Sequence, residues 1–146
     1  MIDRLKRAID FAIAKEKEAE AFYKEWAERA TQPAVKALFS EFAGMECEHA
    51  RKLAQVSPED LLAQGDAPPD LHISDYLVDV EATPNVTLQD AMILAMKREE
   101  AAVSLYEQLA QLTPAARALF GALAEEERRH KRLLESEYDD FILTED

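Results

Sequence analysis

The sequence predicts an all-α protein, a four-helix bundle made of two antiparallel helix hairpins joined by one long crossover. Three observations favour this fold class. Only three of the 146 residues are glycine, and the long segments are rich in the helix formers Ala, Leu, Glu, Lys and Arg. A set of polar residues occurs twice at nearly constant spacing, and a proline-rich stretch separates the two copies. The length suits one core, so residues 1–146 are predicted to form a single domain.

The first hairpin is expected within residues 3–55. Its first helix should cover residues 3–30, where apolar residues recur every three or four positions. Pro33 suits the first turn of a helix, because the N–H that proline lacks would have no helical partner there. The second helix is therefore predicted over residues 33–55, and the short joint at 31–32 makes the two helices antiparallel.

The second hairpin carries similar start signals. Thr87, with Asp90 three residues later, resembles a capping box and opens a helix predicted over residues 87–112. Thr113 followed by Pro114 combines a capping hydroxyl with a first-turn proline. The last helix is predicted over residues 114–137.

Residues 56–86 are predicted to form the crossover, and they hold four of the six prolines. Within them, residues 57–65 are predicted to form a short helix capped by Ser57, and residues 71–81 could be extended. So long a connection is unusual inside a compact domain. It fits a bundle whose second and third long helices run parallel, because the chain must then travel the length of the bundle between them.

The repeated residues are carboxylates, tyrosines and histidines. In the first half, Tyr23 follows Glu16 by seven residues and His49 follows Glu46 by three. The second half repeats the pattern with Glu99, Tyr106, Glu127 and His130, at offsets of 99 − 16 = 83 and 127 − 46 = 81. One glutamate on each of two helices and Glu-x-x-His on each of two others form the ligand set of a two-metal site in a helix bundle.

The helical periodicity places these polar residues on apolar stripes that should face the core. Burying an uncompensated charge costs several kcal/mol or neutralises the group. Four carboxylates without a lysine or arginine on the same stripes would repel one another, whereas two divalent cations would balance their charge. The alternative interpretation is that some of these glutamates point to solvent.

With these residues in place, the chain resembles the ferritin-like di-iron carboxylate proteins, and among them the rubrerythrin group, over residues 3–137. The resemblance implies six ligands: Glu16 and Glu99 as terminal ligands of one iron each, Glu46 and Glu127 as bridging ligands, and His49 and His130 completing the two irons. It also implies catalytic support from Tyr23 and Tyr106, whose hydroxyls would bond to ligand carboxylates and orient them. Core aromatic packing is the alternative role for both tyrosines.

Two departures from the family pattern are visible. Typical rubrerythrins add a rubredoxin domain with two Cys-x-x-Cys knuckles, and this sequence has a single cysteine, Cys47. They also carry a further glutamate about one turn beyond the terminal ligand, where this chain has Ala101, Ala102 and Val103. The site is therefore expected to be a symmetric six-ligand centre, and either Glu20 or Glu126 could be a partner for a ligand histidine.

The function implied by the resemblance is oxidoreduction at two iron ions, with manganese or zinc as possible occupants. Ferrous iron would reduce hydrogen peroxide or dioxygen, as a peroxidase or ferroxidase, and an external donor such as a rubredoxin would supply electrons. The alternative is a non-enzymatic iron-binding or iron-storage-related protein that uses the same site.

The composition argues against some classes of binding partner and favours one cellular compartment. The formal charge of −13 disfavours nucleic acid and anionic membrane surfaces. No signal peptide or membrane span is expected, and a single cysteine, interpreted as a small apolar residue, suits a reducing cytoplasm. His72 is expected to be a surface or packing residue. A homodimer is predicted, with the six ligands supplied by one chain.

Overall fold

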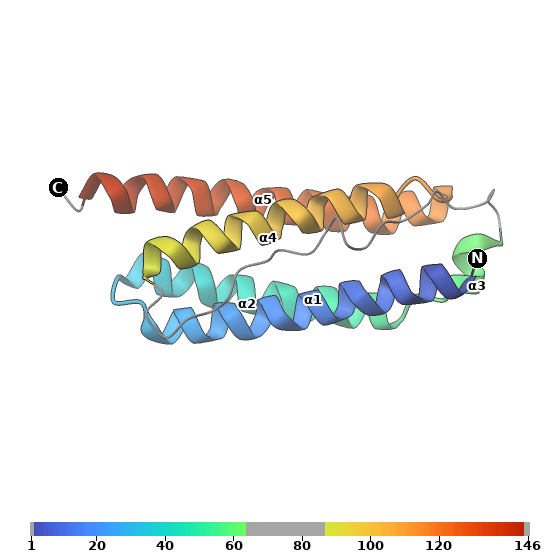
Figure 1. Ribbon diagram of the computed structural model, residues 1–146, viewed down its shortest axis with the longest axis horizontal. Helices are drawn as coiled ribbons and strands as arrows, with labels where there is room; N and C mark the ends of the chain where they lie inside the picture. Colours follow the sequence, from blue (N-terminus) through green and yellow to red (C-terminus); the bar gives the residue numbers. More distant parts are fainter. Residues whose placement is uncertain (1, 64–86, 145–146) are drawn as a thin grey trace.

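The structure, a computed structural model, describes residues 2–63 and 87–144 of the chain (Figure 1). Their elements are all helices. In chain order these are α1 (Ile2–Arg29), α2 (Pro33–Ala54), α3 (Pro58–Leu62), α4 (Leu88–Leu109) and α5 (Pro114–Thr144). The all-α fold class is therefore confirmed. The short α3 lies within the stretch predicted for it, and residues 71–81 and His72 lie outside the described residues.

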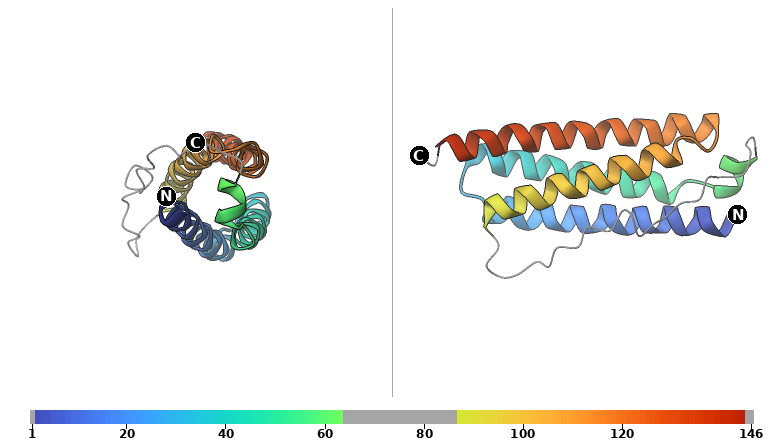
Figure 2. Two further views of the ribbon diagram at one scale, coloured as in Figure 1. Left: turned by 90° about the vertical axis from the view of Figure 1, so that its right-hand side faces the viewer. Right: turned by 45° about the horizontal axis from the view of Figure 1, so that its top comes forward.

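The four long helices form a bundle of two antiparallel hairpins, α1 with α2 and α4 with α5 (Figure 1). Seen end-on, they are arranged in a ring in the order α1, α2, α5, α4 (Figure 2). Helices α2 and α4 run in the same direction, as predicted from the length of the connection between them. The ring also makes neighbours of α1 and α4, and of α2 and α5.

Side-chain caps define three helix starts, and all three were predicted. The Thr87 hydroxyl accepts a 3.1 Å hydrogen bond from the backbone N–H of Asp90 at the start of α4. The Thr113 hydroxyl accepts an equivalent bond from the backbone N–H of Ala116 at the start of α5, and the Ser57 hydroxyl accepts one from Asp60 at the start of α3. Each hydroxyl satisfies one N–H that has no acceptor within its own helix.

Among the long helices, two ends differ from the prediction by more than one residue. Helix α4 ends at Leu109 rather than at residue 112, because the chain needs room to reverse direction before Pro114. Backbone bonds from Gln111 to Gln108 and from Leu112 to Leu109 close this tight turn. Helix α5 continues to Thr144 rather than ending at residue 137. Tyr138 explains the continuation, because it packs on the apolar core and its hydroxyl accepts a 3.1 Å bond from the Gln89 side chain.

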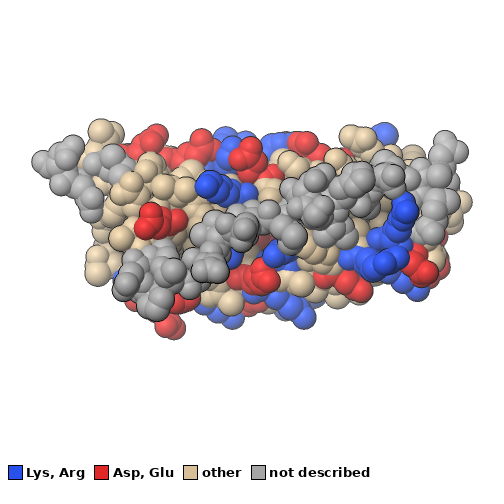
Figure 3. Space-filling model, in the orientation of Figure 1, with Lys and Arg blue, Asp and Glu red and all other residues tan. Residues whose placement is uncertain are grey.

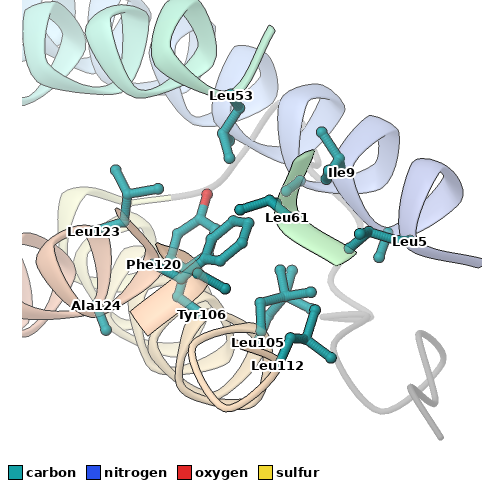
Figure 4. Close-up of a cluster of buried hydrophobic side chains, with 14 residues drawn as sticks. Leu5, Ile9, Leu53, Leu61, Leu105, Tyr106, Leu112, Phe120, Leu123 and Ala124 are labelled. Atoms are coloured by element: carbon teal, nitrogen blue, oxygen red, sulfur yellow. The ribbon is translucent and has the colours of Figure 1, made fainter. Parts of the chain in front are cut away.

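The apolar core consists of two clusters separated along the bundle axis. One cluster contains Leu5, Leu53, Leu105 and Phe120, and Leu61 of α3 points into it at the end of the bundle (Figure 4). The other is formed by residues nearer the opposite end, which include Trp26, Val35, Phe39, Met92 and Leu134. On every long helix the repeated glutamates and histidines fall between the residues of the two clusters, so apolar packing encloses them from both ends.

The outer surface carries charges of both signs. Figure 3 shows acidic and basic side chains intermixed over one face of the bundle. Among the described residues, no helix combines the length and apolar character needed to cross a membrane.

Candidate metal centre

Six acidic and imidazole side chains from the four long helices meet in the interior at mid-bundle. Each is at most 3% exposed: Glu16, Glu46, His49, Glu99, Glu127 and His130. All six were singled out by the repeated sequence pattern. All six belong to one chain, with one glutamate each from α1 and α4 and Glu-x-x-His each from α2 and α5.

The six residues form two overlapping groups of four. Glu16, Glu46, His49 and Glu127 make the first group, and Glu46, Glu99, Glu127 and His130 make the second. Within each group, one nitrogen or oxygen per residue lies within 4.8 Å of the corresponding atoms of the others. Glu46 and Glu127 belong to both groups, so their carboxylates lie between the two positions.

Both imidazoles direct Nδ1 toward the carboxylates. Nδ1 of His49 lies 2.7 Å from Glu127 Oε1 and 3.5 Å from Glu16 Oε2. Nδ1 of His130 lies 2.9 Å from Glu46 Oε1 and 3.6 Å from Glu99 Oε1. The two rings are nearly parallel, with centroids 6.1 Å apart.

The inward-facing atoms of this cluster lack hydrogen-bond partners among the described residues. There are seven such atoms: Glu16 Oε2, Glu46 Oε1, Glu99 Oε2, both Glu127 oxygens and Nδ1 of each histidine. They approach one another closely, yet they do not meet in hydrogen-bonding geometry. Buried polar atoms normally have partners, so a cluster of seven buried nitrogen and oxygen atoms without partners fits the binding of a cation.

Burial and mutual repulsion shift the ionisation of the cluster in the metal-free protein. Burial, together with the nearby charges of Glu127 and Glu16, raises the pKa of Glu46 well above its usual value. Burial opposes a charge on His49 as well, but contact with the carboxylates of Glu127 and Glu16 prevails and raises its pKa to about 10. For Glu127 burial is likewise outweighed, and the neighbouring His130 and His49 lower its pKa.

Two tyrosines bond to the carboxylates of Glu99 and Glu16, and each bond crosses from one hairpin to the other. The Tyr23 hydroxyl on α1 donates a 2.6 Å hydrogen bond to Glu99 Oε1 on α4. The Tyr106 hydroxyl on α4 donates a 2.5 Å bond to Glu16 Oε1 on α1. Burial raises the pKa of both phenols well above the usual value, so both remain neutral donors. Each bond leaves the second oxygen of its carboxylate buried and without a hydrogen-bond partner among the described residues.

The outer nitrogens of the two histidines have different partners. Nε2 of His49 meets a carboxylate oxygen of Glu126 in a very short contact. Nε2 of His130 lies 3.2 Å from the sulfur of Met45. Of the two acidic residues considered from the sequence, Glu126 is therefore the histidine partner, whereas Glu20 pairs with Lys24 at 2.8 Å. The contact with Met45 was not predicted, because a methionine between helices looks like ordinary packing.

Two pockets reach the cluster. A cavity of about 50 Å³ lies between α1 and α4, lined by Ala102, Tyr106 and several of the clustered carboxylates, with Lys15 and Arg98 also on its wall. This is far smaller than the roughly 300 Å³ at which pockets for drug-sized ligands begin. A second, surface pocket of about 320 Å³ lies between α2 and α5 and includes Met45, His49 and Glu126.

The bundle and its cluster define a class of protein, the helical carboxylate proteins whose buried glutamates and histidines fit a di-iron site. Comparison with protein-family models gives the particular family. The rubrerythrin model matches residues 8–138, and the chain belongs to the rubrerythrin family. A search of curated proteins found no match. The family and the buried cluster together support a metal site, as predicted.

Proposed function

We propose that the protein is a di-iron oxidoreductase that uses ferrous iron to reduce hydrogen peroxide or dioxygen. The observation that carries this proposal is the set of seven unpartnered buried atoms on six residues. Two divalent cations would bring a charge of +4 to the four carboxylates, and they would give each of these atoms a partner. Without such cations, four carboxylates buried together would be costly to the folded state.

The residues divide into two ligand sets in this proposal. Glu16 and His49 would hold one metal ion, Glu99 and His130 would hold the other, and Glu46 and Glu127, which belong to both groups, would contribute to both. Carboxylate and imidazole donors suit iron and manganese, and zinc can also occupy such sites. When bound, the two ferrous ions supply two electrons to a small oxidant.

The chain's own residues prepare this chemistry in three ways. Tyr23 and Tyr106 fix the terminal carboxylates, so that each offers one oxygen to a metal position. The apolar clusters on both sides keep bulk water away from the ligands. The small cavity next to Ala102 gives access to molecules the size of peroxide or dioxygen, and its volume selects against larger substrates.

Repeated turnover needs a source of electrons, and we propose that this source lies outside these 146 residues. The only cysteine is Cys47, so the sequence has no Cys-x-x-Cys site for a built-in electron-transfer iron. A rubredoxin or a similar carrier is the proposed donor.

We also propose that the protein acts as a homodimer, which light scattering at micromolar concentration would test.

Metal analysis of anaerobically purified protein, followed by rapid mixing with oxygen and with peroxide, tests the proposal. We expect two iron ions per chain and one round of ferrous oxidation without a donor. Continued turnover should require added reduced rubredoxin. Protein that binds two iron ions but oxidises neither with either oxidant would support the iron-binding alternative. Protein that binds no metal would contradict both functions.

A further inference from the structure

The two halves of the centre have the same pattern of residues, but the Nε2 atoms of the two histidines contact different side chains. Residue 126 in the second half corresponds to residue 126 − 81 = 45 in the first, the offset that relates the two Glu-x-x-His motifs. These equivalent positions hold Glu126 and Met45. Each packs across the α2–α5 interface against the histidine of the opposite hairpin, so Glu126 contacts His49 and Met45 contacts His130.

The difference in chemistry between the two contacts is large. A carboxylate is a strong, charged acceptor for an imidazole N–H, whereas a thioether sulfur is a weak one. A carboxylate bonded to Nε2–H fixes the tautomer that leaves Nδ1 free to bind metal, and it makes Nδ1 a stronger electron donor. Among the described residues, His49 has such a carboxylate partner, whereas the partner of His130 at this nitrogen is the sulfur of Met45.

We infer that Glu126 makes the metal position of His49 the tighter of the two, so that the two ions bind at inequivalent positions. This inference rests on the proposed metal centre. Removing a partner of this kind typically costs about 10–100-fold in metal affinity. The first ion should therefore bind with Glu16 and His49, and the second with Glu99 and His130.

Unequal steps alone would not establish the inference. Two cations held close together repel each other, so even identical positions would bind the second ion more weakly. The decisive result is how each step responds when the partners of the histidines are exchanged. The chain offers an exchange that keeps the composition constant, because both residues can be swapped in the double variant Met45→Glu/Glu126→Met.

Calorimetric titration of the metal-free protein with cobalt(II), with the cobalt absorption spectrum followed in parallel, is the proposed experiment. Glu126→Met should weaken the tighter step by about 10–100-fold. Glu126→Gln keeps the shape and a neutral acceptor, so it should weaken that step less. Glu48→Gln is the matched control. Glu48 lines the same surface pocket, but its carboxylate bonds to Arg51, so both steps should remain unchanged.

Variants of the terminal ligands assign each step to a position. In the natural background, Glu99→Ala should keep the tight step and Glu16→Ala should lose it. In the Met45→Glu/Glu126→Met background this order should reverse, which a merely structural role of Glu126 would not produce. Titration steps that do not respond to Glu126→Met, or an order that the exchange leaves unchanged, would overturn the inference while leaving the metal centre standing. A natural protein that binds no cobalt would overturn the metal centre itself.

Discussion

The Tyr23 hydroxyl on α1 donates a hydrogen bond to Glu99 on α4, and through it one hairpin orients a carboxylate of the other. The bond from Tyr106 to Glu16 does the same in the opposite direction. Both bonds are buried, and they link the hairpins at the level of the candidate metal centre. The geometry of the Glu16 and Glu99 carboxylates therefore depends on how the two hairpins pack together.

Tyr23→Phe is expected to destabilise the metal-free protein. The substitution leaves Glu99 Oε1 buried without its donor, and an unsatisfied buried group costs about 1–3 kcal/mol. Denaturant unfolding in the presence of a chelator measures the effect. Tyr138→Phe is the matched control, because Tyr138 is only partly buried and bonds to Gln89 away from the cluster. Equal losses in the two variants would contradict the role given to the crossing bond.

Glu127→Ala should abolish binding of both metal ions, whereas Glu16→Ala should mainly weaken one. The difference is expected because Glu127 belongs to both groups of four residues and Glu16 to only one. Metal analysis of the purified variants measures the number of ions bound per chain. Full metal content in Glu127→Ala would refute the bridging assignment.

The metal-free protein should lose stability as the pH rises from about 6.5 to about 10. The pKa of His49 is raised from 6.5 to about 10 in the folded protein. The stability contributed by its charged form is therefore fully present below the unfolded pKa and is lost as the pH rises through the folded one. The raised pKa of Glu46 acts in the same direction, because ionisation of this carboxyl disfavours the folded state.

Glu127 should make the metal-free protein less stable at low pH. Its pKa is lowered, so the stability that it contributes is present above its ordinary pKa of 4.5 and is lost as the pH falls. Denaturant unfolding at a series of pH values, with a chelator present, tests both limbs. His49→Gln should flatten the alkaline limb. Saturating metal should also flatten the alkaline limb. Metal binds the neutral imidazole, so its affinity increases as the pH rises and offsets the lost stability.

Ala102→Leu should slow the reaction with peroxide and dioxygen without reducing the metal content. Ala102 lines the small cavity between α1 and α4, and a larger side chain would fill space that the oxidant needs. Metal analysis and rapid mixing of the reduced variant measure the two effects separately. An unchanged rate would show that the oxidant reaches the cluster by another path.

The helices could be predicted from the sequence because their starts are marked by local residues. Pro33 and Pro114 mark first turns, and Thr87 and Thr113 cap the helices that follow them. The end of α5 was not accessible in the same way. No glycine or proline stops the helix after residue 137, and its continuation depends on packing of Tyr138 near the start of α4, which is a long-range contact.

The six clustered residues were also found, because their repetition at constant offsets separates them from the many surface glutamates. The crossing of the tyrosine bonds was missed, although a signal existed. Seven residues of α-helix rise about 10 Å, so Tyr23 cannot reach Glu16 on its own helix. The choice between Glu20 and Glu126 needed the structure, because it depends on which helices are neighbours in the ring.

The two pockets lie on opposite sides of the bundle, one at the α1–α4 interface and the other at the α2–α5 interface. The first is small and reaches the carboxylates. The second is wider and reaches His49 past Glu126, whose side chain is 37% exposed. The carboxylates and His49 are therefore reached from opposite sides of the bundle, so a side chain enlarged at Ala102 would leave the pocket beside His49 and Glu126 unchanged.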